Sequence, residues 1–182
     1  MEFERVDRIT AGAVGEPGQR TFFIQAREGE RLITIMVEKE QVELLGTSIL
    51  EILASVGRET GEGPPSEELG LEPPLEPLWR AGRLSIGYAE DRDLMLLELE
   101  EQAEEAEDAE AEEVQGLGTP DDATEPARVR LWATCEQMLA LARHGAEVAA
   151  RGRPRCRFCG NPMDPEGHLC PAMNGHRETA GR

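Results

Sequence analysis

Cysteine and histidine residues gather near the C-terminal end of the chain, in RCRFCGNPMDPEGHLCPAMNGHR, and they are the side chains best suited to chemistry. Cys156 and Cys159 have the CxxC spacing that lets two thiolates bind one tetrahedral ion. Cys170 and His176 follow after ten and five intervening residues. Three sulfur ligands favour zinc over magnesium or calcium. The spacing therefore predicts a zinc site formed by Cys156, Cys159, Cys170 and His176.

Besides His176, two other residues are candidates for the fourth ligand of this site, His168 and Cys135. His168 lies two residues before Cys170, a spacing expected to strain simultaneous ligation, whereas His176 follows the turn CPAMNG and reaches more easily. Cys135 is far away in sequence, where a small buried hydrophobe is the commoner role, and it ranks below either histidine. Four filled positions leave no place for water, so the predicted site is structural rather than catalytic. Iron is also compatible with these ligands, and a redox role for the CxxC fits the proline- and glycine-rich surroundings less well.

A second segment with chemical potential is the glycine-rich GAVGEPGQR over residues 12–20. Its glycines resemble those of a phosphate loop, but Pro17 removes an amide donor and no Lys-Ser/Thr pair follows. We expect a connector, and beside Arg20 it is the first place to look for a small anionic ligand. His144 is expected on the surface of a helix. No Walker motif, GxGxxG, GxSxG or HExxH occurs, which favours a protein that is not an enzyme.

The net charge of −18 disfavours nucleic-acid binding by the chain as a whole. The region around the cysteine cluster is locally basic, so it could bind RNA although the whole chain is acidic. An RNA-associated zinc ribbon would use its four arginines: Arg151, Arg153, Arg155 and Arg157. The other interpretation of these arginines is a solvated helix end. No stretch is apolar enough to span a membrane and no signal peptide opens the sequence, so a cytoplasmic protein is expected.

The elements that must position these residues are strands and two amphipathic helices. The first predicted helix is EKEQVELLGTSILEILASVG, which ends at Gly57. The second is TCEQMLALARHGAEVAARG. Six stretches rich in β-branched and apolar residues predict strands at residues 3–10, 21–26, 31–37, 84–89, 94–99 and 128–133. Residues 60–77 are expected to be an unfolded linker, and residues 100–126 a solvated acidic loop, with a transient helix as the alternative.

The two strand-and-helix patterns resemble one another. ITIMVEKEQVELL aligns without a gap on VRLWATCEQMLAL, which superimposes Gln41 on Gln137 and Leu45 on Leu141. We expect an α+β fold made of a duplicated β-β-β-α unit, an antiparallel sheet with two amphipathic helices, plus a C-terminal zinc knuckle; the alternative is a chance match. The expected boundaries are a first unit at 1–58, a Pro/Glu-rich linker at 59–78, a second unit at 79–150 with an acidic insertion at 100–126, and the knuckle and tail at 151–182.

Three parts of the sequence together resemble the domain of unknown function 3090 family of high-GC Gram-positive bacteria: FERVDRITAGAVGEPGQRTFFIQA, the units ending in EKEQ and TCEQ, and CRFCGNPMDPEGHLCPAMNGHR. The resemblance spans nearly the whole chain outside the linker and the acidic insertion, and it implies the architecture but no activity. The residues themselves favour a zinc-binding adaptor or regulator that is not an enzyme and binds a partner protein. A protein or enzyme that binds a small anionic metabolite through residues 12–20 is the alternative, and an RNA-associated zinc ribbon the third.

Overall fold

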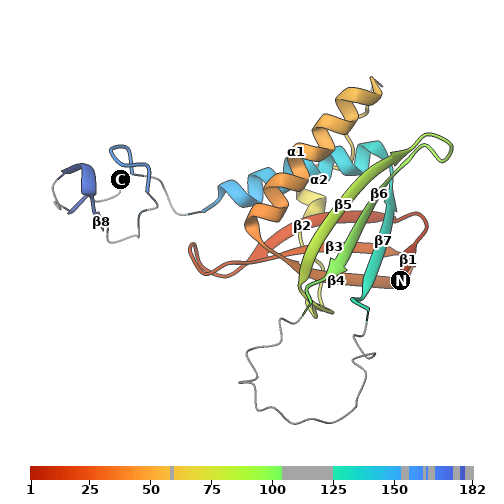
Figure 1. The fold of residues 1–182 in the computed structure, drawn as a ribbon, viewed down its shortest axis with the longest axis horizontal. Coiled ribbons are helices and arrows are strands. Elements are labelled where there is room, and N and C mark those ends of the chain that lie inside the picture. Colours follow the sequence, from red (N-terminus) through yellow and green to blue (C-terminus); the bar gives the residue numbers. More distant parts are fainter. Residues whose placement is uncertain are drawn as a thin grey trace, which may run out of the picture.

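Two sheets and two helices form the α+β body of this protein in the computed structural model (Figure 1). The structure describes residues 1–57, 60–103, 125–152, 156–161, 163, 167–173 and 177–178. Both helices lie together on one side of the two sheets, whose strands cross each other (Figure 1). Among the described residues, no helix is long and apolar enough to cross a membrane.

The first half of the body is an antiparallel meander followed by a helix. Its elements are β2 (Arg8–Val14), β3 (Thr21–Glu28), β4 (Arg31–Val37) and α1 (Lys39–Val56). The hairpin between β3 and β4 was expected, and so was the end of α1 at Gly57. Gly12 lies within β2 rather than in a connector, because the pairing of β2 with β3 continues to the end of the strand.

The second half repeats this order of elements, with β5 (Ala81–Ala89), β6 (Leu94–Glu101), β7 (Arg128–Ala133) and α2 (Cys135–Ala150). The short strand β1 (Glu2–Phe3) adds to this sheet by pairing with β7 in parallel. β6 extends into the start of the expected acidic loop because Glu100 pairs with Arg128 across the hairpin, with an ion pair of 2.9 Å. Most of that loop, residues 104–124, lies outside the described residues.

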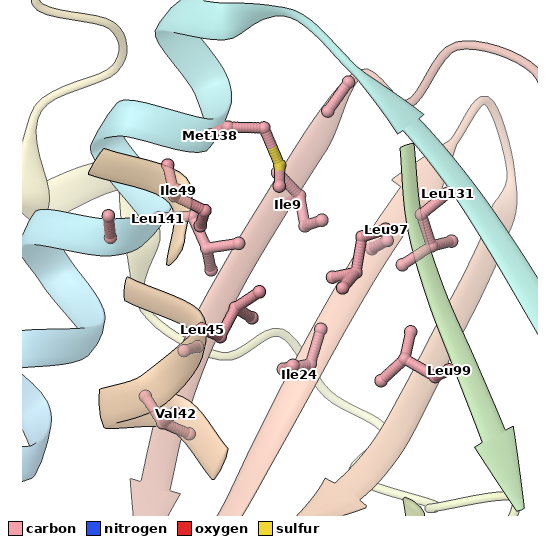
Figure 2. Packing of buried hydrophobic residues seen from close by; sticks show 14 of the residues in the cluster. Ile9, Ile24, Val42, Leu45, Ile49, Leu97, Leu99, Leu131, Met138 and Leu141 are labelled. Atoms are coloured by element: carbon pink, nitrogen blue, oxygen red, sulfur yellow. The ribbon is translucent and has the colours of Figure 1, made fainter. Parts of the chain in front are cut away.

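The hydrophobic core lies between the sheets and the helices. Each helix packs against the first strand of the other half, α1 on β5 and α2 on β2, and the two helices pack on each other. Figure 2 shows Ile9 and Ile24 from one sheet and Leu97 from the other facing side chains of both helices. Where the helices meet, a Cβ on Gly46 would lie 3.4 Å from the carbonyl oxygen of Ala142.

Two glutamines make the same hydrogen bonds in the two halves. The side-chain oxygen of Gln41 accepts from the backbone N–H of Glu38 (2.7 Å), the N-cap of α1, and its amide donates to two carbonyls where β5 begins (3.1 and 3.3 Å). Gln137 accepts from Thr134 (2.9 Å), the N-cap of α2, and donates to two carbonyls just before β2 (both 3.0 Å). Each glutamine therefore caps its own helix and attaches it to the other half.

Residues 60–77 run from α2 onto the face of the β2–β3–β4 sheet that lies opposite the hydrophobic core. They include the 3₁₀ helix η1 (Ser66–Leu69), and the side chain of Leu69 is 1% exposed. Buried Thr10 donates to the carbonyl of Leu69 (2.5 Å). Gln25 donates to the carbonyl of Glu72 (2.9 Å) and accepts from its N–H (2.8 Å). The expectation of an unfolded linker is therefore wrong for these residues.

Candidate metal centre

The first two cysteines lie on a tight turn. The N–H of Gly160 donates to the carbonyl of Cys156 (2.8 Å), and the N–H of Cys156 donates to the carbonyl of Asn161 (2.8 Å). Gly160 has a φ of 72°, in the left-handed region that glycine adopts without a steric penalty. The turn directs the N–H of Phe158 towards the sulfur of Cys156 at 3.4 Å. Such amide donors stabilise a thiolate, the form in which cysteine binds metal.

The other two candidate ligands come from a short hairpin. His168 lies on β8 (His168–Leu169), which pairs with β9 (Arg177–Glu178), and Cys170 follows directly. The ligand atoms of Cys156, Cys159, His168 and Cys170 all lie within 4.8 Å of one another.

Two of the distances can be compared with those expected around zinc. Ligand bonds of about 2.3 Å to sulfur and about 2.0–2.1 Å to nitrogen at tetrahedral angles place two sulfurs about 3.8 Å apart, and a sulfur and a nitrogen about 3.6 Å apart. The sulfurs of Cys156 and Cys170 are 3.8 Å apart. The sulfur of Cys159 lies 3.6 Å from Nε2 of His168. These two distances match those around tetrahedral zinc, and the four residues could hold a metal ion. The sulfur separation is far too long for a disulfide of about 2.05 Å.

Burial and hydrogen bonding act in opposite directions on the thiols. Cys156 and Cys170 are 2% and 0% exposed, and Met163 packs beside them. For Cys156, desolvation raises the pKa, but backbone N–H donors at Cys159 and Phe158 and the side chain of His168 outweigh it and lower the pKa to about 6. For Cys170, desolvation and the neighbouring cysteine side chains raise the pKa. Cys156 is therefore the thiol that ionises most readily of these two.

The structure brings together the three cysteines that the spacing singled out, Cys156, Cys159 and Cys170, with His168 as the histidine. The argument against His168 fails for a simple reason. Side chains two residues apart on an extended segment point to the same side, so the ligand atoms of His168 and Cys170 lie within 4.8 Å of each other. His176 lies outside the described residues, and its ligation stays a prediction.

The remaining cysteine, Cys135, has the role expected of it. It is 3% exposed at the first residue of α2, within the core of the body. It does not belong to the cysteine and histidine cluster.

A family model described as a protein of unknown function, DUF3090, matches residues 1–170. The chain belongs to the DUF3090 family. This confirms the resemblance seen in the sequence, and the DUF3090 match includes all four clustered ligands and ends at Cys170. No curated protein and no solved structure matches the chain. Membership of the DUF3090 family therefore identifies the chain without assigning it an activity.

The arginine row near the cluster is described only in part. Arg151 forms an ion pair with Glu147 (3.7 Å), and the guanidinium of Arg157 lies 4.7 Å from the ring centre of Phe158. Arg153 and Arg155 lie outside the described residues. Both described arginines thus have partners within the chain.

Two further residues from the sequence analysis lie next to α2. Arg20, which ends the glycine-rich segment, donates to the carbonyl of Val148 at 3.5 Å. His144 is 6% exposed, so the expectation that it lies on the surface is wrong. It is buried because α2 packs against β2 and against residues 66–69 as well as against α1. The hydrophobic periodicity of α2 does not reveal that β2 and residues 66–69 bury His144.

His168→Ala is expected to weaken zinc binding by more than the ~10–100-fold that loss of an outer hydrogen-bond partner costs, because it removes a ligand itself. His176→Ala is expected to leave affinity within about twofold of the wild type, as for a side chain outside the ligand set. Competition with a chromophoric chelator measures both affinities. The reverse result, with His176→Ala the damaging change, would restore the spacing-based prediction.

Proposed function

We propose that this DUF3090 protein is a zinc-binding adaptor or regulator without enzymatic activity, whose C-terminal knuckle binds a partner protein. The observation that carries the proposal is the closed set of three cysteines and one histidine, with all ligand atoms within 4.8 Å. Four protein ligands fill a tetrahedral zinc site, and such closed sites stabilise folds rather than activate water. The soft sulfur ligands support zinc over magnesium or calcium.

A structural role for zinc is supported by how little the knuckle buries. Among the described residues, its buried cluster consists of Cys156, Met163 and Cys170, with Cys159 packed against it. So small a cluster does not offset the conformational entropy of ordering the segment. Metal binding would supply the missing free energy, because ligands that assemble only on folding convert binding energy into stability.

The proposed partner surface consists of the residues between the ligands. Phe158 lies between the first two cysteines and is 49% exposed, and Leu169 lies between His168 and Cys170 and is 71% exposed. Ligands that point inwards to one ion leave the intervening side chains pointing outwards. Large apolar residues at exposed positions of so small a module are typical of binding surfaces. Arg157, stacked on Phe158, would add a contact for an acidic group of the partner.

We also propose that the body is a duplicated β-β-β-α unit. In the first sheet Ile24 lies opposite Ala11, and in the second Leu97 lies opposite Ile86. Val6 and Asp7 lie five and four residues before Ala11. Ala81 and Gly82 lie at the same two distances before Ile86. These are the four carbonyls that the two capping glutamines bind. The same residue type making equivalent contacts in both halves supports duplication over a chance match.

The adaptor role is tested with a variant that keeps the metal but loses the surface. Full-length protein captures partners by cross-linking in its own cells, and the captured partner is then purified. Combined Phe158→Ala and Leu169→Ala is expected to keep about one zinc per chain and to lower affinity for the purified partner about tenfold or more. Leu44→Ala, at an equally exposed apolar residue of α1 (68%), is the control expected to bind like the wild type. Failure to retain any partner reproducibly, or equal affinity of the double variant, would contradict the proposal.

A further inference from the structure

A cleft of ≈ 880 Å³ lies in the body, where the C-terminal half of α2 faces the end of β2 and residues 66–75. Its polar lining includes Arg20, His144 and Arg151. We propose that this cleft binds a small molecule carrying one terminal anionic group, a phosphate or a carboxylate, on an apolar body. This inference goes beyond the proposed adaptor role and is independent of the knuckle, because none of the four clustered ligands Cys156, Cys159, His168 and Cys170 lines the cleft.

His144 is the first observation that points to a ligand. It is 6% exposed, and its Nδ1 is buried without a hydrogen-bond partner among the described residues. Desolvation lowers its pKa, Glu147 opposes the shift, and Arg151 and Arg8 add to it, so the site favours the neutral ring. A buried N–H without an acceptor is costly, which favours the tautomer with the proton on Nε2; Nε2 is then the ring nitrogen able to donate to an anion, and Nδ1 is left as an acceptor without a donor in the described part of the chain.

The other half of the body offers an internal comparison. The alignment that superimposes Gln41 on Gln137 also superimposes Ser48 on His144 and Ser55 on Arg151. Ser48 is partly exposed and Ser55 is exposed. The first half therefore folds with small polar residues at these two positions. His144 in α2 and Arg151 directly after α2 both line the cleft, and this placement fits a ligand-binding role.

The arginines supply the charge for an anion. Within the described residues Arg20 forms no ion pair, and its bond to the carbonyl of Val148 is long at 3.5 Å. Arg151 pairs with Glu147 at 3.7 Å, but both side chains are well exposed, and such pairs contribute little. A guanidinium binds phosphate or carboxylate through two parallel N–H groups. Arg20 and Arg151 both line the cleft, so an anionic group bound there would offer them a charge-assisted partner.

The remaining lining limits the class of ligand. Glu67 and Glu147 also line the cleft, and their charges disfavour a polyphosphate, whereas one anionic group is within the capacity of two arginines. Apolar side chains make up another part of the wall: Val14, Leu69, Leu71, Leu75 and Val148. This wall would accept a ring or a short hydrocarbon attached to the anionic group.

The experiment uses the full chain and three matched probes: phenyl phosphate, benzoate and neutral phenol. Isothermal titration is expected to show saturable binding of at least one anionic probe and none of phenol. Arg20→Ala is expected to weaken that binding about tenfold or more, since a charge-assisted pair of hydrogen bonds is lost. Arg20→Lys, which keeps the charge without the planar fork, is expected to fall between Arg20→Ala and the wild type. Arg83→Ala, at an exposed arginine outside the cleft, is the control expected to match the wild type.

A second measurement locates the bound probe without relying on any variant. The ring signals of His144 in proton–carbon spectra are expected to shift on addition of the anionic probe, while those of His168 stay unchanged. Absence of saturable binding for both anions overturns the proposal. So does equal binding of phenol, equal weakening by Arg83→Ala, or binding that leaves the His144 signals in place.

Discussion

Cys170→Ser is expected to release the zinc ion and unfold the knuckle while the body stays folded. Cys170 is fully buried and contributes one of four candidate ligands, so its loss opens the site. Structural zinc contributes about 10–16 kcal/mol of apparent binding free energy in small modules, far more than the few buried side chains of this knuckle. The core of the body shares no residue with the knuckle cluster, so its unfolding temperature should change by no more than about 2 °C.

Elemental analysis of tag-free protein measures the metal, and circular dichroism measures the unfolding of the body. The wild type should contain about one zinc per chain, and Cys170→Ser close to none. Cys135→Ser is the matched control, because it changes a buried cysteine of the body that is outside the cluster, and it should keep the zinc. Iron in place of zinc, or full zinc in Cys170→Ser, would contradict the ligand assignment. Collapse of the body in Cys170→Ser would show that the two clusters are coupled.

Leu69→Ala is expected to destabilise the body by about 2–5 kcal/mol, the cost of truncating a buried leucine. Leu69 is 1% exposed, and its carbonyl accepts a hydrogen bond from Thr10. Leu71 packs nearby, so closely above β2 that a Cβ on Gly12 would lie 2.5 Å from its Cγ. An unfolded linker would give almost no effect, so chemical denaturation of this variant separates the two descriptions of residues 60–77.

The matched control for Leu69→Ala is Leu78→Ala, a few residues further along the same chain segment. Leu78 is 56% exposed, so its truncation should cost no more than about 0.5 kcal/mol. Limited proteolysis provides a second measurement, because a packed segment resists cleavage until the body opens. Equal stabilities of the two variants, with rapid cleavage between residues 60 and 77 in the wild type, would mean that the segment does not pack on the sheet.

Local patterns were enough to predict the main elements. The β-branched runs at 31–37 and 128–133 correspond to β4 and β7 with the same bounds, and the apolar residues of both helices face the core as their spacing predicts. These signals arise within single elements, where side-chain periodicity reports which face is buried. The same holds for the CxxC pair, whose spacing alone brings two sulfurs together.

Features that depend on contacts between distant segments were missed. Residues 60–77 have the composition of a solvated linker, yet Thr10, Gln25 and Thr34 form a buried polar row across three strands that requires hydrogen-bond partners. That row was visible in the sequence as polar residues alternating with apolar ones, but nothing local identified what covers it. His144 was misjudged for the same reason, since it is buried by other elements, and nothing local showed that a strand pairing places His168 beside the three cysteines.

The crossed packing of the helices has a consequence for how the chain must fold. α1 rests on the second sheet and α2 on the first, so neither half alone contains the surface that its own helix needs. A single half could bury its helix only against a second copy, as in a symmetric dimer whose stability rises with concentration. When both halves belong to one polypeptide, their association is intramolecular, and its effective concentration is set by the connecting segment rather than by the protein concentration. Because both helices and both sheets belong to one polypeptide, dilution cannot separate a helix from the sheet on which it packs.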